Sequence, residues 1–555
     1  MTDIHLGPLL RHAGTNEATV WVQTTAPCTV EVRPKGRPAA SERTFTVEGH
    51  HYALVHVTEL PADTAIPYEV ALDGDVVWPE ADSRFPPSVL RTHTLEDPVR
   101  IIFGSCRVAA PHEPPYTLRK DEDDRGREID ALRGFALRMT HADPDEWPHA
   151  LLLLGDQVYA DEVHPDLEGD LDGGEFVVSY DDYVKLYTKA WGEPVIRWLL
   201  STVPSAMIFD DHDVHDDWNT SIEWVTEMRQ KAWWRKRIVA AFESYLIYQH
   251  LGNLSPSERA EFELYEKLRT DPNATELLRA FAKQADEEVE GTRWSFCRDI
   301  GPARVVMVDS RAGRVLDPGN RSMVDRDEWH WIEEHARGDV QHLLIGTSLP
   351  LFMGPAMHWL EAWNEVVADG AWGKGVKKLA EKLRQELDLE HWAAWQASFR
   401  RMCDLITEVG AGRRGNAPST ICVLSGDVHH AYLAEVGFQP GAGVQSAVWQ
   451  AVCSPFRNPL DTKEQRVILA GWTRFGGLVM RALARRAGVA DPPVQWRLAH
   501  EKPWFNNQVA MLEFEGARAT FVLEKAIPPE DGKGEPVLER VYERPIEPNA
   551  EYTRT

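Results

Sequence analysis

The first part of the chain alternates apolar and polar positions in short runs. Ala18 to Val22 and Thr29 to Val32 are two such runs, and Pro and Gly residues separate the runs from one another. Alternation with a period of two, broken by turn residues, is typical of antiparallel strands that bury one face. The pattern therefore predicts a small N-terminal β-sandwich domain over residues 1–95.

After Pro98 the pattern changes to brief, unbroken apolar runs separated by long amphipathic stretches, as in the buried strands of an α/β domain. Six of these runs end directly in small or polar residues: Val99 to Phe103, Leu151 to Leu154, Ala206 to Phe209, Val305 to Val308, Leu343 to Ile345 and Ile421 to Leu424. Ligands bind outside the carboxyl ends of strands in open α/β sheets. We therefore predict an α/β domain over residues 96–526 with its functional site where these strand ends meet.

Two helical stretches, residues 220–290 and 351–415, interrupt the strand series as insertions and are rich in Trp. Trp at helical spacing is expected to pack helices against a sheet, and a substrate-binding aromatic surface or a lid is the alternative. Gln508 to Phe514 and Ala519 to Leu523 predict a hairpin near the end of the chain. Residues 527–555, rich in Pro and Glu, are expected to form a loosely ordered C-terminal tail.

The excess of acidic residues excludes some classes of binding partner. The 555 residues include 60 Lys and Arg against 87 Asp and Glu, a net charge of −27. A chain this negative repels phosphate backbones and anionic lipids, so we expect neither sequence-independent nucleic-acid binding nor membrane association. An anionic substrate then needs bound cations or a few Arg side chains.

The remaining composition predicts a cytoplasmic protein. The N-terminal residues show no signal peptide and no twin-arginine leader, and no apolar run approaches the roughly 18 residues of a spanning helix. The six cysteines stand apart without CxxC spacing, which argues against a zinc knuckle or a disulfide framework. Five of them, all except Cys106, are expected to be small buried residues.

Chemically versatile side chains follow the predicted strands. They are the thiol of Cys106, the carboxylates of Asp156, Asp211 and Asp427, the phenol of Tyr159, and the imidazoles of His212 and His429. One Asp after a strand is usually a helix N-cap, but three, each with Tyr or His within three residues, indicate a metal site. Carboxylates suit hard cations, whereas thiolate, phenolate and imidazole suit a trivalent or softer transition ion. Two metals that share the Asp156 carboxylate would reconcile this set.

Other polar residues near the strand ends have two interpretations. Arg107 and Arg311 either clamp a phosphate bidentately or pair with a neighbouring Asp. His215 and His430 lie beside the candidate ligands and are expected to support them or to face solvent.

Five motifs carry a resemblance to a known family: FGSCR (103–107), GDQVYADE (155–162), FDDHDVHDDW (209–218), VDSRAGR (308–314) and SGDVHHAY (425–432). In this order they are similar to the motifs of alkaline phosphatase D (PhoD-like) phosphatases, within the calcineurin-like metallophosphatases, over nearly the whole chain. The resemblance implies a metallophosphatase-type β-sandwich/α-β catalytic domain with helical insertions. It also implies that the N-terminal β-sandwich is fibronectin III-like.

The resemblance also implies a ligand set. Cys106, Tyr159 and His429 stand where the family holds Fe³⁺, and Asp156 stands where its carboxylate bridges two metals. Asp211 and Asp427 stand at the second metal, expected to be Ca²⁺, with Zn²⁺, Mn²⁺ or Mg²⁺ as alternatives. This chain departs from the family pattern in having Asp216 and Asp217 in place of paired Asn, and in offering no His after the strand that ends at Gly346.

These observations predict a phosphoric ester hydrolase that cleaves phosphate mono- or diesters of small molecules with a metal-bound hydroxide. His212 is expected to act as the general acid or to stabilise charge on phosphorus, and Arg107 and Arg311 to bind phosphate. The alternative is a non-catalytic, Ca²⁺-stabilised binding protein with a degenerate metallophosphatase fold, although calcium does not favour a thiolate. A Ser hydrolase is disfavoured because neither Ser105 nor Ser348 lies in a GxSxG motif.

Overall fold

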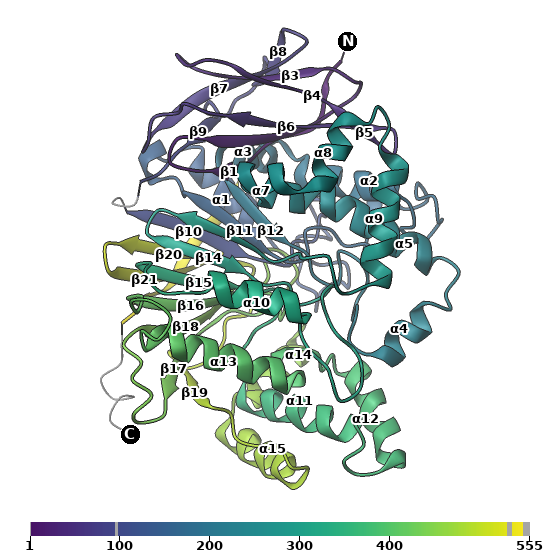
Figure 1. Ribbon diagram of the computed structural model, residues 1–555, viewed down its shortest axis with the longest axis vertical. Helices are drawn as coiled ribbons and strands as arrows, with labels where there is room; N and C mark the ends of the chain where they lie inside the picture. The colour runs from purple at the N-terminus through teal and green to yellow at the C-terminus, as the bar shows by residue number, and fades with distance from the viewer. Residues whose placement is uncertain (1, 95–97, 530–534, 548–555) are drawn as a thin grey trace.

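The computed structural model describes residues 2–94, 98–529 and 535–547. Its N-terminal part, purple in Figure 1, consists of two antiparallel sheets with strand orders β1-β2-β6-β5 and β4-β3-β7-β8, and β9 pairs with β7. The strands are β1 (Ile4–Ala13), β2 (Ala18–Thr24), β3 (Thr29–Pro34), β4 (Ala40–Arg43), β5 (Phe45–Val47), β6 (His50–Val57), β7 (Ala65–Leu72), β8 (Asp75–Trp78) and β9 (Val89–Arg91). Val20 and Val55 of one sheet share a buried core with Val30 and Val70 of the other. The predicted antiparallel β-sandwich is confirmed.

Two mixed sheets form the larger part of the molecule, with orders β12-β11-β10-β20-β21-β22 and β13-β14-β15-β16-β18-β17-β19. The first holds β10 (Val99–Gly104), β11 (Ala150–Leu154), β12 (Ser205–Ile208), β20 (Gln508–Glu515), β21 (Arg518–Ile527) and β22 (Val537–Pro545). The second holds β13 (Phe296–Ile300), β14 (Ala303–Met307), β15 (His342–Gly346), β16 (Thr420–Ser425), β17 (Tyr432–Phe438), β18 (Ala447–Val452) and β19 (Val494–Leu498). All six predicted strands are present.

The predicted strand ends come from two sheets that pack face to face. β10, β11 and β12 are parallel neighbours in one sheet, and β14, β15 and β16 are parallel neighbours in the other. Phe103 and Leu153 of the first sheet belong to the same buried cluster as Leu344 and Leu424 of the second. Because both sheets bury one face in this shared core and the other under helices, their strands carry no polar alternation.

The end of the chain differs from the sequence prediction. The predicted hairpin is confirmed as β20 and β21, but β22 continues the same sheet by pairing antiparallel with β21. Residues 537–545 were expected to lie in a loosely ordered tail, and this expectation is wrong because their backbone groups complete the sheet edge. Residues 530–534 and 548–555 of that stretch lie outside the described residues.

Helices cover the outer faces of the two sheets, and Figure 1 shows α10 and α13 in front of the sheet that contains β14 to β16. The helices are α1 (Ala131–Met139), α2 (Tyr180–Trp191), α3 (Pro194–Thr202), α4 (Ile222–Met228), α5 (Trp234–Ser244), α6 (Leu251–Asn253), α7 (Pro256–Glu261), α8 (Glu263–Thr270), α9 (Thr275–Glu287), α10 (Arg326–His335), α11 (Pro355–Ala368), α12 (Lys374–Glu386), α13 (Gln396–Gly410), α14 (Thr462–Gly471) and α15 (Arg474–Arg486).

The Trp-rich insertions serve mainly as packing layers. Trp224, Trp234, Trp392 and Trp395 are buried, whereas Trp372 is 38% exposed. The predicted packing role is therefore confirmed for the buried Trp residues. Within the described residues, no single helix has the length and apolar composition to cross a membrane, although α14 and α15, bent by 67°, pass that test when taken together.

Candidate metal centre

Several candidate ligands share an unusual backbone conformation at the carboxyl ends of strands. The backbone φ angle is +55° at Cys106, +52° at Asp156, +64° at Asp427 and +49° at His429. For residues other than glycine, this left-handed region costs on the order of 1–2 kcal/mol per residue and persists only where the surroundings impose it. The sharp turns after β10, β11 and β16 therefore aim these side chains into one common space.

The first cluster contains Cys106, Asp156 and His429, whose possible ligand atoms all lie within 4.8 Å of one another. Tyr159 extends this cluster, because its hydroxyl donates to Oδ2 of Asp156 at 3.3 Å. The amide of Asn458 donates to the same phenol oxygen at 3.4 Å. The structure thus brings together the four residues predicted for the ferric ion.

Two further clusters adjoin the first. Asp156, Asp211 and His212 form one, and Asp210, Asp211 and Asp427 form the other, each with its ligand atoms within 4.8 Å of one another. Asp156 belongs to the first and second clusters, and Asp211 to the second and third. The three clusters therefore make one continuous centre, in which Asp156 is shared by two clusters, as its predicted bridging role requires.

The donor set fits bound cations. Burial, together with the neighbouring carboxylates, raises the pKa of Asp156 and of the Cys106 thiol well above their usual values, and burial lowers the pKa of His429 to about 3. Among the described residues, Oδ1 of Asp156 is buried and accepts no hydrogen bond. Buried anionic donors require a compensating positive charge, and neutral imidazole is the ligating form of His. A sulfur, nitrogen and oxygen set suits a transition ion, and the all-carboxylate set suits a hard cation.

His212 lies at the rim of this centre and is held from one side. Its Nδ1 lies 3.0 Å from both carboxylate oxygens of Asp161, and its ring stacks on Tyr159 with centroids 4.6 Å apart. Burial alone lowers the pKa of His212, but Asp161 and Asp211 raise it well above its usual value. The side chain remains 22% exposed, so a substrate can reach it.

Arg311 lies beneath the centre and contacts four carboxylates. Its Nη2 lies 3.2 Å from Asp211 and 3.4 Å from Asp427, and its other nitrogens pair with Asp210 and Glu390. The side chain is fully buried. Of the two interpretations that the sequence left open, the structure places Arg311 in the ion pair.

Arg107 also occupies an ion pair. Its Nη2 lies 2.8 Å from Asp130 and 3.3 Å from Glu193, and its Nη1 donates to the carbonyl of Ala190 at 2.6 Å. These contacts use both terminal nitrogens of the Arg107 guanidinium. Neither arginine therefore enters the proposed function as a phosphate-binding residue.

Sequence reasoning missed the polar residues that support the second metal position. His391 places Nε2 3.2 Å from Oδ2 of Asp427 and Nδ1 2.6 Å from Glu361. The strand end at Gly346 offers no His of its own, but the Trp392 indole donates to Oγ1 of Thr347 at 3.3 Å and so brings His391 to that edge. The signal in the sequence is the ionisable pair Glu390 and His391 beside buried Trp residues.

The other flanking residues lie beside the three clusters. His215 places Nδ1 3.6 Å from Asp161, and Nδ1 of His430 lies 2.6 Å from the carbonyl of Val428. The amide of Asp217 donates to Oδ2 of Asp211 at 3.0 Å. Asp210 completes the third cluster, and its signal was its place as the first residue of the DDHD run directly after β12.

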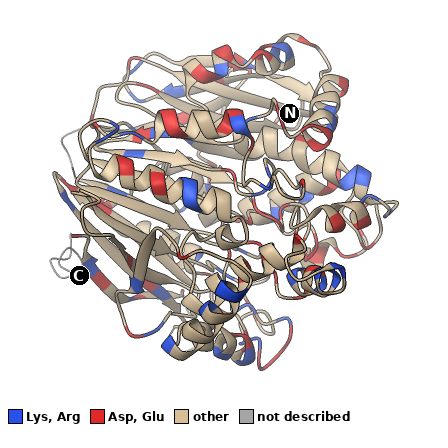
Figure 2. Ribbon diagram, turned by 60° about the horizontal axis from the view of Figure 1, so that its bottom comes forward, with Lys and Arg blue, Asp and Glu red and all other residues tan. Residues whose placement is uncertain are grey.

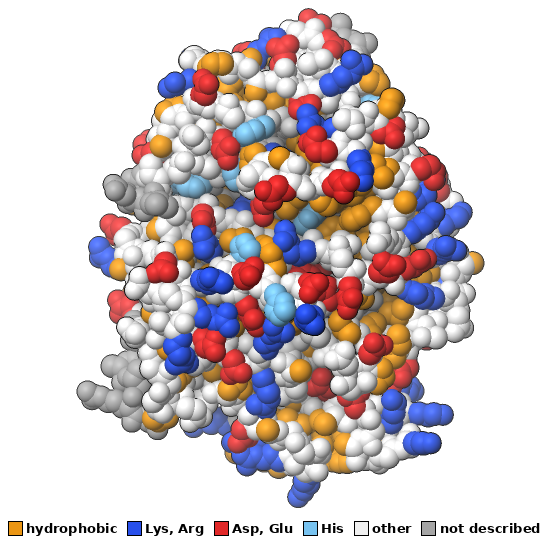
Figure 3. Space-filling model, viewed as in Figure 1, with side chains coloured by type: hydrophobic (Ala, Val, Ile, Leu, Met, Phe, Trp, Pro, Cys, Tyr) orange, Lys and Arg blue, Asp and Glu red, His pale blue; other side chains and the backbone are white. Residues whose placement is uncertain are grey.

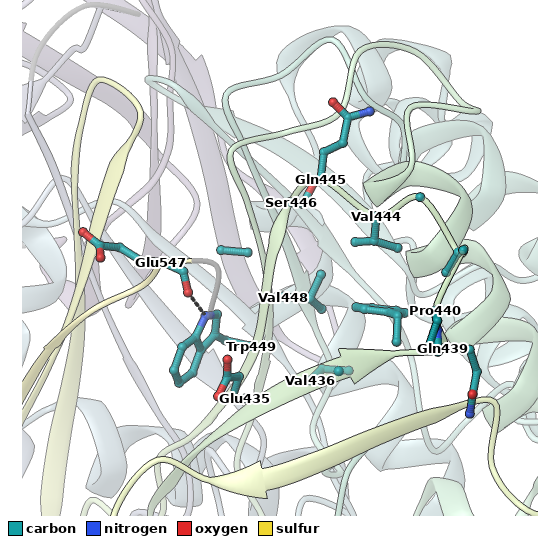
Figure 4. A pocket seen from close by; sticks show the side chains of 16 residues that line it. Glu435, Val436, Gln439, Pro440, Val444, Gln445, Ser446, Val448, Trp449 and Glu547 are labelled. Atoms are coloured by element: carbon teal, nitrogen blue, oxygen red, sulfur yellow. Dashed lines mark hydrogen bonds between the residues drawn. The ribbon is translucent and has the colours of Figure 1, made fainter. Parts of the chain in front are cut away.

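A separate cavity of about 360 Å³ lies at the far end of β17 and β18, where Val436, Val448 and Trp449 line it (Figure 4). His429 precedes the start of β17, whereas the cavity surrounds the loop that follows its end. A strand of seven residues is about 23 Å long, so this cavity is remote from the candidate centre. It carries no part of the predicted chemistry.

Comparisons with known proteins identify a family and two structures with a similar fold. A family model described as PhoD-like phosphatase matches residues 133–473, and one described as a domain of unknown function (DUF7800) matches residues 1–90. A solved structure of PhoD matches with a TM-score of 0.59 at 11% identity, covering 98% of this chain and 90% of that chain. A purple acid phosphatase isolated from yellow lupin (Lupinus luteus) seeds matches with a TM-score of 0.50 at 10% identity, covering 99% and 75%. No curated protein matches the sequence.

Proposed function

The chain belongs to the PhoD-like phosphatase family, and on that basis we propose that it is a metal-dependent phosphoesterase that hydrolyses phosphate mono- or diesters of small molecules. One observation carries this proposal. Asp156 belongs both to the cluster with Cys106 and His429 and to the cluster with Asp211 and His212. A carboxylate shared by a sulfur-containing donor set and an oxygen-rich donor set is the arrangement that two unlike metals require.

We assign Fe³⁺ to the donors of Cys106, Asp156, Tyr159 and His429. The second metal, Ca²⁺ in this proposal, would take carboxylate oxygens from Asp156, Asp211 and Asp427. When bound, the two ions supply positive charge that stabilises phosphate oxygens and lowers the pKa of water towards about 7. They also offset the carboxylates that crowd this centre and would otherwise repel an anionic substrate.

His212 is the proposed general acid. With Nδ1–H donated to Asp161, Nε2 is the nitrogen that faces the ester. As a water oxygen adds to phosphorus and the ester P–O bond breaks, the departing oxygen takes the proton from Nε2. The proton that the attacking water loses passes to solvent, and solvent then restores the proton on Nε2. Asp161 keeps the imidazole oriented and stabilises its protonated form.

Arg311 is the proposed positioning residue for the second metal. Its guanidinium contacts Asp210, Asp211 and Asp427 from the buried side, and Glu390 balances its remaining charge. Because the contacts are fixed by burial, the carboxylate oxygens keep one orientation towards the centre.

The test is elemental analysis together with hydrolysis of an aryl phosphate monoester and a diester by the purified full chain. We expect iron and calcium near one equivalent each, a visible absorption band from phenolate-to-iron charge transfer, and hydrolysis of at least one ester. Asp156→Asn should lower both metals and activity together, and Tyr159→Phe should bleach the band while the chain stays folded.

Two variants serve as matched controls. Asp325→Asn changes a buried carboxylate that caps α10, and Tyr116→Phe changes a phenol that packs near Tyr159 without joining the clusters. Both should keep full metal content and colour. Stoichiometric calcium without iron or hydrolysis would replace the proposal with a calcium-stabilised binding protein, and stoichiometric zinc in a colourless enzyme would overturn the ferric assignment.

A further inference from the structure

The consecutive helices α14 and α15, which meet at a bend of 67° and are here called the hairpin, expose large apolar side chains. Phe475 is 78% exposed, Val467 67%, Leu478 65% and Val479 49%. Single exposed apolar residues are ordinary on protein surfaces, but these four gather on one pair of consecutive helices. We call this surface the hairpin face. Its exposed apolar area indicates a binding surface.

The opposite side of the hairpin is fixed to the body of the protein. Ala484 is buried with Trp359 and Ala362 of α11. A Cβ at Gly477 would lie 3.0 Å from Cβ of Pro355, so α15 packs closely against the start of α11. Because α15 is anchored on this side, the side chains of the hairpin face stay directed away from the core.

The hairpin is basic in an acidic chain. Residues 461–491 contain six Lys and Arg against three Asp and Glu, whereas the whole chain has a net charge of −27, and Asp491 pairs with Arg481 and Arg485. Arg466, Arg474 and Arg486 are exposed, and none of them takes part in an ion pair with any residue that the structure describes. Figure 2, which brings the bottom of Figure 1 forward, shows Lys and Arg bands on the helices there, and Figure 3 shows blue and orange side chains together at the lower end of the molecule.

We propose that the hairpin face docks this protein onto the surface of a lipid bilayer that contains anionic lipids. Apolar side chains flanked by Arg on an amphipathic helix insert at the boundary between headgroups and acyl chains, and the Arg side chains bind anionic headgroups. A second copy of the chain is a poor occupant, because a two-fold contact would bring the same arginines against one another. The net charge of the whole chain led us to expect no membrane association, and the local positive charge reverses this expectation for the hairpin face.

The hairpin lies on the bilayer surface and does not cross the bilayer. α14 has 10 residues and α15 has 13, which correspond to about 15 Å and about 20 Å of helix. Each is shorter than the hydrocarbon core of about 30 Å, and the 67° bend prevents the two from acting as one span. This geometry matches a protein held at one leaflet.

The hairpin also begins close to the candidate centre along the chain. Asn458, which donates to the phenol of Tyr159, precedes the start of α14 at Thr462 by four residues. Four residues of extended chain span at most about 14 Å. The start of α14 is therefore tied by a short piece of chain to a residue that contacts the candidate centre.

The test is co-sedimentation of the full chain with vesicles of phosphatidylcholine alone and with vesicles that contain one third phosphatidylglycerol. We expect binding to the anionic vesicles only, with an affinity that falls at least about ten-fold between 50 mM and 500 mM NaCl. Phe475→Ser with Leu478→Ser should weaken binding at least about ten-fold, and Arg474→Gln with Arg486→Gln should weaken it by a similar factor. The arginine pair is a surface change that leaves the packed side of α15 intact.

Lys378→Gln with Leu379→Ser is the matched control, because Leu379 on α12 is 67% exposed beside an exposed Lys. This control should bind like the unaltered chain, and all variants should hydrolyse a soluble ester at the unaltered rate. The proposal is overturned by equal binding to both vesicle types or to neither, and by binding that the hairpin variants leave unchanged. It is also overturned by a dimer, detected in sedimentation velocity, that the Phe475 and Leu478 changes abolish.

Discussion

His212 and Asp161 determine which imidazole nitrogen can reach a substrate. Asp161 contacts Nδ1 and Tyr159 covers one ring face, whereas Oδ1 of Asp216 lies 3.7 Å from Nε2, beyond hydrogen-bond distance, so Nε2 is the nitrogen that can still contact a substrate. The same ring lies beside Asp156 and Asp211 in a metal cluster. His212 can therefore act as a proton donor, a charge stabiliser or a metal ligand. Substrates with different leaving groups distinguish these three roles.

The first prediction is that His212→Ala slows an alkyl phosphate ester about 10²–10⁴-fold and an activated aryl ester much less. An alkoxide needs a proton to depart, whereas an activated phenolate departs unaided. Metal content should stay unchanged. The measurement is kcat/KM for both esters, together with iron and calcium analysis of each variant.

Asp161→Asn distinguishes orientation from direct participation. The amide keeps the shape of the carboxylate but no longer stabilises the protonated imidazole, so this variant should lose activity in the same order of substrates and to a smaller extent. Equal losses on both esters would assign charge stabilisation to His212, and loss of metal would make His212 a ligand.

At the residue scale, the sequence indicated which side chains meet, although their role as metal ligands stays a prediction. Cys106, Asp156 and Asp427 lie two residues after the ends of β10, β11 and β16, and the structure brings them together. His391 and Asp161 could not be found in this way, because their positions depend on contacts made across the fold, such as that of Trp392 with Thr347. Such contacts leave no periodic signal in the sequence.

At the element scale, the two sheets lie in close contact where β10 and β16 end. A Cβ at Gly426 would lie 2.0 Å from Oγ and 2.4 Å from Cβ of Ser105. The Ser105 hydroxyl also accepts a hydrogen bond from the amide of Asp427 at 3.0 Å. Cys106 and Asp427 are each the next residue along, so this contact sets the separation of ligands that come from different sheets.

The second prediction is that Gly426→Ala destabilises the protein by about 1–3 kcal/mol and lowers metal content, because the added methyl group must push the two strand ends apart. Urea unfolding and metal analysis provide the measurements. Gly375→Ala is a matched control, since an added Cβ there would meet nothing within 4 Å.

A second change tests the stated cause. Ser105→Gly removes the atoms that the new methyl group meets, so the double variant should regain part of the metal content that Gly426→Ala loses. If the two changes are simply additive, the contact between the strand ends does not set the ligand geometry.

The buried strands were predictable from the sequence, but the order of the strands within each sheet was not. Six buried strands stand out as apolar runs, yet β10 pairs with β20, about 400 residues later in the chain, and the runs divide between two sheets. β22 was missed because its side chains are mostly exposed and only its pairing with β21 makes it a strand. Hydrogen bonds between strands far apart in the chain determine both the strand order and the formation of β22. The composition of a single segment carries no information about such pairing.

At the scale of the whole molecule, charged side chains also join the N-terminal sandwich to the helical layer. Arg279 of α9 pairs with Glu48, which follows β5, and the amide of Glu48 donates to Oγ1 of Thr275 at 2.7 Å. Glu243 of α5 lies behind this contact, with Oε1 3.8 Å from Nε of Arg279. Its side chain is 4% exposed, so the carboxyl is poorly solvated at a junction between two parts of the chain.

The last prediction concerns pH. Burial, followed by the charge of Glu48, raises the pKa of Glu243 from 4.5 to about 8. Between these two values the folded protein holds a proton that the unfolded chain has released, so the free energy of unfolding falls as the pH rises from about 5 to about 8. Glu243→Gln cannot ionise. It should therefore be more stable than the unaltered chain at pH 8, by about 2–4 kcal/mol, and nearly equal to it at pH 5. Urea midpoints across this range measure the difference, and Glu227→Gln, which changes a 66% exposed partner of Lys231, is the control that should leave the pH slope unchanged. An unchanged slope in Glu243→Gln would mean that the carboxylate at this junction is ionised in the folded protein and that Arg279 compensates it fully.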